Sequence, residues 1–237
     1  GFPGSFGDML YTCDWTTGNI YYHPLEPYRA SFLAKQAVFH KLPRATDIDV
    51  DGYSRIYLAD WRNGKFKYKG PEEKVGMIHQ VTYPQGEAAQ YVEVTRVEDA
   101  KLPALLKSRS AVQRLETQRE MIQRGPKETF AQKTIALAKD DKAPLYARVA
   151  AIFTFKQLYG QDATPELAKL VGDASIREFA LRAMTDRLSE LEGVPLDPYL
   201  TALDDPDPRV RLQATIGLGR LKAKSAAPAL LKAAANW

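Results

Sequence analysis

The chain has 237 residues, which is enough for one large domain or two of ordinary size. Hydrophobic residues make up 45% of it, so it can bury substantial cores, and its formal net charge is +4. Residues 1–100 carry 11 basic and 13 acidic residues, whereas residues 101–237 carry 22 and 16. No cluster of basic residues with interleaved aromatics stands out, so we expect no nucleic-acid partner.

A single cysteine, Cys13, excludes an intramolecular disulfide, a cysteine-based metal cage and a CxxCH heme attachment within these residues. We expect Cys13 to be a buried, inert thiol. No apolar run reaches the roughly 18 residues that a membrane span requires, so we expect no membrane span. The chain begins with Gly1 and shows no signal peptide, so we expect it to start partway into a larger fold.

A motif of twelve residues occurs twice in the first half of the chain. Leu10–Tyr21 and Ile56–Lys67 align at a spacing of 46 residues, and the matched positions are Tyr11/Tyr57, Asp14/Asp60, Trp15/Trp61 and Gly18/Gly64. A repeat of about 40 to 50 residues with strand-type sequence is typical of β-propeller blades. We predict a partial propeller of about two blades over residues 1–100.

Short runs of β-branched and aromatic residues, bounded by Gly, Pro and Asp, predict the strands of these blades. Asp51-Gly52 is the strongest hairpin signal in the chain. The predicted strands are Met9–Thr12, Asn19–Tyr22, Thr46–Val50, Arg55–Ala59, Lys65–Tyr68, Val75–Tyr83 and Gln90–Val97. They suffice for about two four-stranded blades. Because a closed propeller usually has four to eight blades, we expect further blades of the same protein, or another polypeptide, as partners.

The repeated Asp-Trp pairs favour a structural role. We expect each Asp to accept hydrogen bonds at a strand end and each Trp to cover the flank of a blade; a cofactor role for Asp14 or Asp60 is the alternative. Asp47, Asp49 and Asp51 imitate the start of a calcium loop, but Leu58 stands where an EF-hand needs an acidic residue. Alternation favours a strand there instead.

Histidines and aromatic residues offer two further candidate sites in this half. His23, His40 and His79 lack partners at metal or triad spacing, so surface or hydrogen-bonding roles are favoured. A sugar-binding platform is the alternative to a blade core for one set of aromatics: Tyr11, Trp15, Tyr21, Tyr22, Tyr28, Tyr57 and Trp61. We favour the core.

From about Pro103 onward the apolar period changes from two residues to 3.6, which predicts helices. An arginine recurs at Arg114, Arg148, Arg177 and Arg211, at spacings of 34, 29 and 34 residues. A small residue follows three positions later, and a large apolar one seven positions later (Met121, Phe155, Met184 and Leu218). We predict about four HEAT-like repeats over residues 101–237.

The last repeat is the clearest. Asp205 or Asp207 can cap a helix, Pro208 suits its first turn, and Gly217 and Gly219 relieve crowding near its end. Residues 226–231 begin its partner helix. This unit closely resembles a HEAT repeat, in which antiparallel helix pairs stack into a solenoid. The apolar last helix lacks a polar cap, so we expect more repeats or another domain to follow.

Blades with a Y-x-x-D-W-x-x-G line followed directly by HEAT-like helices resemble one family of large proteins of planctomycetes and verrucomicrobia, which are classed as dehydrogenases. The resemblance is strongest at residues 7–84 and 105–125, where it includes the run A-V-Q-R-L-E-T-Q-R-E. It implies a propeller like that of glucose/sorbosone dehydrogenases, then HEAT repeats, and commonly a c-type cytochrome domain. This chain resembles a central fragment of such a protein.

The family resemblance implies a periplasmic or otherwise exported protein. The full-length parent would oxidise a sugar or similar alcohol with heme c or pyrroloquinoline quinone, and the propeller end and helices would dock a redox partner domain. This sequence has no CxxCH and lacks the early blades that hold the quinone and catalytic histidine in related enzymes. We therefore assign no catalytic, cofactor or metal residue to it. For these residues alone, a scaffold that binds a protein or glycan is the alternative.

Overall fold

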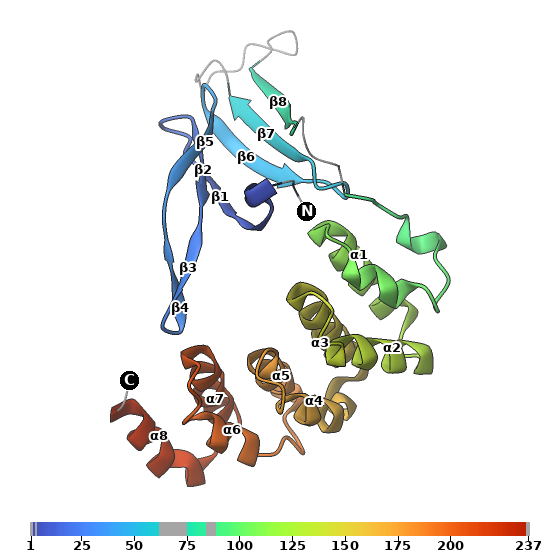
Figure 1. The fold of residues 1–237 in the computed structure, drawn as a ribbon, viewed down its shortest axis with the longest axis vertical. Coiled ribbons are helices and arrows are strands. Elements are labelled where there is room, and N and C mark those ends of the chain that lie inside the picture. Colours follow the sequence, from blue (N-terminus) through green and yellow to red (C-terminus); the bar gives the residue numbers. More distant parts are fainter. Residues whose placement is uncertain (1, 3, 62–74, 84–88, 236–237) are drawn as a thin grey trace. The chain divides into compact units, whose positions relative to one another are not determined.

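The computed structural model describes residues 2, 4–61, 75–83 and 89–235. These residues divide into two compact units. One comprises mainly residues 1–28 and 32–92 with residues 108–113, and the other comprises residues 29–31, 93–107 and 114–237. The first unit contains the strands and the second the α-helical array (Figure 1). A β-region therefore precedes a helical region, as the change of period predicts.

The described residues of the β-unit form two three-stranded antiparallel sheets and a two-stranded ribbon. The first sheet has the order β1-β2-β5 and the second the order β6-β7-β8, and β3 pairs with β4. The bounds are β1 Leu10–Cys13, β2 Asn19–His23, β3 Leu25–Tyr28, β4 Ser31–Ala34, β5 Ala37–Lys41, β6 Ala45–Val50, β7 Ile56–Trp61 and β8 Gly76–Val81. A short 3-10 helix, Gly4–Asp8, precedes β1.

Several strand predictions are confirmed and others are wrong. The Asp51-Gly52 hairpin joins β6 and β7, and the strands around Gly18 are β1 and β2. Gln90–Val97 does not form a strand: Val94–Arg96 is a 3-10 helix. The predicted strand Lys65–Tyr68 lies outside the described residues. Strands β3, β4 and β5 were missed; Pro24 precedes β3 and Pro27 lies within it, so the β-pattern is interrupted at the first of the three. The described sheets have three strands rather than four, and they do not form a closed propeller.

A single hydrophobic core holds the β-unit together. Ile20 of β2 and Leu58 of β7 are fully buried, and Phe2, Leu42, Ala45 and Ile56 complete the cluster. Strand β7 alternates strictly between buried and half-buried positions, as expected for a central strand with one face in the core. The β3–β4 ribbon contributes nothing to this core, since all eight of its residues are exposed.

The helical unit consists of eight α-helices linked by short 3-10 segments. The α-helices are α1 Ala111–Arg124, α2 Glu128–Lys139, α3 Leu145–Tyr159, α4 Thr164–Leu170, α5 Arg177–Met184, α6 Asp197–Ala202, α7 Pro208–Arg220 and α8 Ala227–Ala235. The 3-10 helices are Val94–Arg96, Leu102–Lys107, Gly160–Ala163, Leu188–Glu190 and Lys224–Ala226. None of the described helices is long and apolar enough to cross a membrane.

The helices stack in two layers. Helix α5 packs against both α3 and α7, whereas α2 packs against α4 (Figure 1). The predicted repeat positions explain this packing. The small residues Thr117, Ala151, Ala180 and Ala214 are fully buried. The large apolar residues Met121, Phe155, Met184 and Leu218 are at most 5% exposed. The spacing of arginine, small residue and apolar residue is therefore the core pattern of a helical repeat.

Helix α7 shows how local sequence sets a helix boundary. Asp207 caps its N-terminus by accepting a hydrogen bond from the backbone N–H of Arg209 at 2.8 Å, and Pro208 occupies the first turn. A Cβ on Gly217 would lie 2.3 Å from Tyr199 of α6, so glycine is needed for this close approach. No such contact exists at Gly219, where the expected relief of crowding is wrong.

Candidate functional site: interaction surfaces

Asp14 of the first Asp-Trp motif stabilises the turn between β1 and β2. Its carboxylate accepts hydrogen bonds from the backbone N–H of Thr16 (2.8 Å) and Thr17 (3.2 Å) and from the Thr17 hydroxyl (2.7 Å). These bonds, led by that of the Thr17 hydroxyl, lower the pKa of Asp14. Gly18 closes the turn with a φ of +73°, and a Cβ there would collide with the carbonyl oxygen of Leu42. Asp14 therefore accepts hydrogen bonds within the turn that follows β1.

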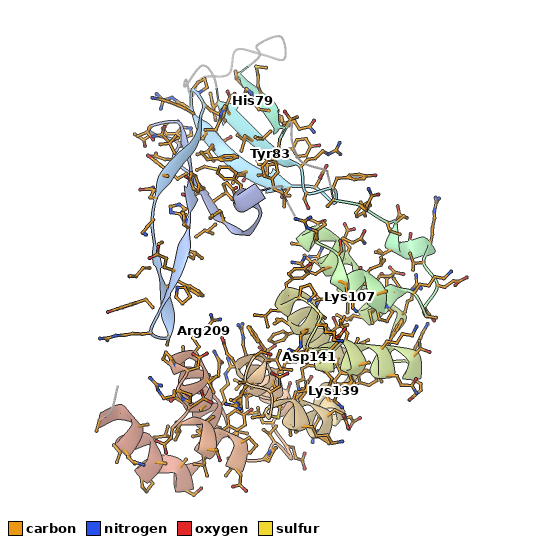
Figure 2. The ribbon with its side chains drawn as sticks, in the orientation of Figure 1. His79, Tyr83, Lys107, Lys139, Asp141 and Arg209 are labelled. Atoms are coloured by element: carbon orange, nitrogen blue, oxygen red, sulfur yellow. The ribbon has the colours of Figure 1, made fainter. Side chains whose placement is uncertain are left out.

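Asp60 of the second motif binds across the sheet rather than within a turn. Its side chain is fully buried, and its Oδ1 accepts from the backbone N–H of Met77 at 3.0 Å. The Nε2 of His79 lies 3.1 Å from Oδ2 (Figure 2 labels His79 on β8). The two matched aspartates therefore play different structural parts. Gly64, the last position of the second motif, lies outside the described residues.

The two tryptophans meet at Arg44. The Arg44 guanidinium lies over the Trp15 ring, 4.4 Å from its centroid, and the Arg44 carbonyl accepts from the backbone N–H of Trp61 at 2.9 Å. Both tryptophans are half-buried. Arg44 precedes β6 and was not singled out in the sequence, because nothing local marks it as the residue between two motifs 46 positions apart.

The three aspartates that imitate a calcium loop do not converge. Asp47 and Asp49 each accept from the next backbone N–H, and Asp51 is engaged by Arg55 and by the Tyr57 hydroxyl. They border an open hollow of about 360 Å³ on the β6–β7 face. Within the part of the chain that the structure describes, no group of three or more acidic, histidine or cysteine side chains is arranged to hold a metal ion.

The histidines and the aromatic residues have structural partners. His23 lies 2.8 Å from the Thr12 hydroxyl, whereas His40 is exposed on β5. Tyr11 donates to the Phe6 carbonyl at 2.8 Å and packs edge-on against Phe39, and burial raises its pKa to about 12. The aromatics around Tyr11 thus pack against one another within the β-unit. Cys13 is half-buried rather than buried, and burial raises its pKa.

Two of the four recurring arginines form ion pairs with the loop that opens the next repeat. Arg148 of α3 is almost fully buried, and its guanidinium binds the Asp173 carboxylate, the Ser175 hydroxyl (2.7 Å) and the Ala138 carbonyl (2.8 Å). Arg177 of α5 pairs in the same way with Asp205. The hydrogen bond from Arg148 is the largest of the effects that lower the pKa of Asp173 to about 2.

The other two recurring arginines also contact groups outside their own helix or in the loop before it. Arg211 donates to the carbonyls of Asp205 (2.8 Å) and Pro206 (3.1 Å), and Arg114 stacks on the Tyr146 ring at 4.4 Å. The aspartate of the earliest loop, Asp140, accepts instead from Lys107, which Figure 2 labels. Asp140 and Asp173 were missed in the sequence, and Asp205 was considered there only as a possible helix cap. Their near-equal spacing of 33 and 32 residues is a signal that could have found them.

A buried lysine joins the third helix to a distant loop. The Lys156 side chain is 1% exposed, and its Nζ donates to the Gly160 carbonyl at 3.0 Å. Oε2 of Glu190 lies 2.9 Å from Nζ, which is ion-pair distance. Lys156 lowers the pKa of Glu190. This pair ties α3 to the 3-10 helix Leu188–Glu190.

The two helix layers differ in charge. Helices α1, α3, α5 and α7, which we call the arginine layer, contain nine arginines, one lysine and three acidic residues. Helices α2, α4, α6 and α8 contain four lysines, three acidic residues and no arginine. Neighbouring helices of the arginine layer are linked directly. Gln118 donates to the Ala150 carbonyl, Arg182 stacks over Phe153, and Arg209 pairs with Glu178 (Figure 2 labels Arg209).

Comparison with known proteins yields one match. Residues 210–236 match a family model described as the PBS lyase HEAT-like repeat. This segment covers α8 and most of α7, the repeat whose sequence is clearest. No curated protein and no solved structure matches the chain. The match agrees with the predicted HEAT-like repeats and does not extend to the strands or to a dehydrogenase.

Proposed function

We propose that the helical unit is a binding scaffold whose stacked repeats present a continuous surface to a macromolecular partner. The observation that carries this proposal is the two-layered repeat array, in which each repeat buries one helix face against its neighbours and leaves the other exposed. Stacked helical repeats create extended surfaces of this kind, and side chains at repeating positions supply the contacts.

The bonding of the conspicuous polar groups also favours a scaffold. Arg148, Arg177, Asp60 and Lys156 are each held by partners that tie one element to another. Such bonding fixes the distance between helices or strands, as a rigid binding surface requires.

A selection experiment tests this function. The purified chain would be immobilised and challenged with a displayed library of protein fragments from its source organism. We expect enrichment of a limited set of overlapping fragments that bind residues 93–237 alone as tightly as the whole chain. Circular dichroism would first show that the immobilised chain is folded. If the folded chain then enriches no fragment, the scaffold proposal is contradicted.

The dehydrogenase role that the family resemblance implies makes a different prediction. The full-length parent protein would then carry a redox cofactor with visible absorbance and reduce an artificial electron acceptor when a sugar or alcohol is added. An absorbance spectrum and a dye-reduction assay on the protein isolated from its source would separate the two functions. Export to the periplasm rests on the same resemblance and stays a prediction.

A further inference from the structure

The exposed side of the arginine layer combines guanidinium groups with apolar side chains. On α1, the exposed residues Leu115, Arg119 and Ile122 recur at helical spacing, opposite the buried stripe of Thr117 and Met121. Leu115 is 45% exposed and Ile122 37%. Side chains four and three residues apart lie on one helix face, so these three form a single patch.

The next helices of the layer also expose aromatic, basic and apolar side chains. Tyr146 of α3 is 38% exposed, Arg182 of α5 is exposed, and Ile216 of α7 is 38% exposed. On its own helix each lies away from the buried core positions, such as Ala147 on α3 and Ala214 on α7. We call these side chains the arginine face: Leu115, Arg119, Ile122, Tyr146, Arg182 and Ile216.

The charge of the arginine face is largely uncompensated. Within the described part of the chain, neither Arg119 nor Arg182 forms an ion pair, whereas Glu120 and Glu178 of the same layer pair with Arg124 and Arg209. The Arg182 guanidinium is instead held over the Phe153 ring, 5.7 Å from its centroid. A guanidinium that interacts with an aromatic ring through its face keeps N–H groups available for a carboxylate.

We propose that the arginine face binds an acidic polypeptide segment that is apolar along one side, such as an amphipathic helix with Glu or Asp on its flanks. Charge complementarity selects the acidic groups, since planar guanidinium groups bind carboxylates in a bidentate manner. The exposed Leu115, Ile122 and Ile216 select the apolar stripe, because their burial supplies affinity that charge alone does not. This inference rests on the proposed scaffold function and specifies its partner.

Nucleic acid fits the same face less well. The three aliphatic side chains would lie against a phosphate backbone that gives them no apolar contact. The only lysine of the layer, Lys156, is buried, so the layer lacks the flexible ammonium groups that commonly contact phosphates. A DNA duplex is therefore the alternative partner, and the experiment must distinguish its binding from that of a peptide.

Fluorescence anisotropy with defined probes tests the proposal. The first probe is a fluorescein-labelled helical peptide of about 20 residues with Leu along one side and Glu on both flanks. The comparison probes are a scrambled peptide of the same composition, a peptide with Lys in place of every Glu, and a DNA duplex. We expect the first peptide to bind at least about tenfold more tightly than the other three.

Matched variants locate the site. We expect Arg119→Glu combined with Arg182→Glu to weaken the binding of the acidic peptide by at least about tenfold. The control, Lys169→Glu combined with Lys232→Glu, makes the same charge change at exposed lysines of the other layer and should alter the affinity by less than about twofold. Leu115→Ser combined with Ile122→Ser should also weaken binding. Circular dichroism would confirm that all variants are folded.

Each outcome is decisive. Equal loss in the two charge variants, tighter binding of the duplex, or no binding of the acidic peptide would overturn the arginine-face proposal. If the fragment library nevertheless yields binders of the helical unit, the scaffold function stands and only the partner chemistry is wrong. If the library yields none, the scaffold function itself fails.

Discussion

At the scale of single residues, close contacts decide how near two helices can approach. Gly217 of α7 leaves room for the ring of Tyr199, whose hydroxyl donates to the buried carbonyl of Leu181 at 2.8 Å. Tyr199 is fully buried, and burial raises its pKa. One missing side chain and one hydroxyl thus fix the packing of α5, α6 and α7.

Replacing Gly217 and Gly219 should have opposite effects. Gly217→Ala would push a methyl group against Tyr199 and should cost about 1–3 kcal/mol of unfolding free energy. Gly219→Ala meets open space and should stabilise the helix by about 0.5–1 kcal/mol, because alanine loses less conformational entropy. Urea unfolding followed by circular dichroism measures both changes. Equal effects would mean that the Tyr199 contact does not constrain position 217.

The Asp173 carboxylate gives a second residue-scale prediction. Its pKa falls from 3.8 to about 2 on folding, so its stabilising effect is complete above the unfolded value and disappears as the pH falls from about 4 to about 2. Asp173→Asn leaves the buried Arg148 guanidinium without its anion and should cost about 1.5–3 kcal/mol at neutral pH.

The acid sensitivity of this variant supplies the check. Between pH 4 and pH 2, stability should fall less steeply in Asp173→Asn than in the unaltered chain, because the titrating group is gone. A suitable control is Lys169→Gln, which removes one partner of an exposed pair and should change stability by less than about 1 kcal/mol. Parallel pH curves for Asp173→Asn and the unaltered chain would refute the role of Asp173.

At the scale of elements, strand position explains which segments belong to a core. Strand β7 lies between two neighbours and buries alternate residues, whereas the β3–β4 ribbon exposes all of its side chains, among them Leu25 (42%), Leu33 (52%) and Phe32 (43%). A two-stranded ribbon without a buried face is marginally stable in water. The ribbon must therefore draw its order from β2 and β5, whose strands it extends.

Hydrogen exchange should reflect this difference. Backbone amides of β3 and β4 should exchange at least about 100-fold faster than those at the centre of β7, a difference of about 3 kcal/mol in opening free energy. Mass spectrometry of peptides covering residues 24–35 and 56–61 measures it. Comparable protection in the two peptides would show that the ribbon is covered in solution.

At the scale of the whole molecule, the two hydrophobic cores share no residue. The β-core draws on residues between Phe2 and Tyr83, and the helical core on residues between Val94 and Ala233. Because the helical core is contiguous in the chain, we predict that residues 93–237 fold alone. Their circular dichroism spectrum should be strongly helical, with one cooperative urea transition. An unstructured spectrum would mean that the strands are required for helical packing.

Local patterns allowed the sequence by itself to determine the order of β-region and helices, the Asp51-Gly52 hairpin, a cap for α7 at Asp205 or Asp207, and the buried repeat positions. These features depend on neighbours within about a turn or a strand, where propensity and periodicity act. The pairing of Arg148 with Asp173, of Asp60 with His79, and of both tryptophans with Arg44 joins residues 17 to 29 positions apart. Only the tertiary structure decided those contacts, because the folding of the chain rather than the local sequence sets which distant groups meet. The same holds for strands β3, β4 and β5 and for the arginine face.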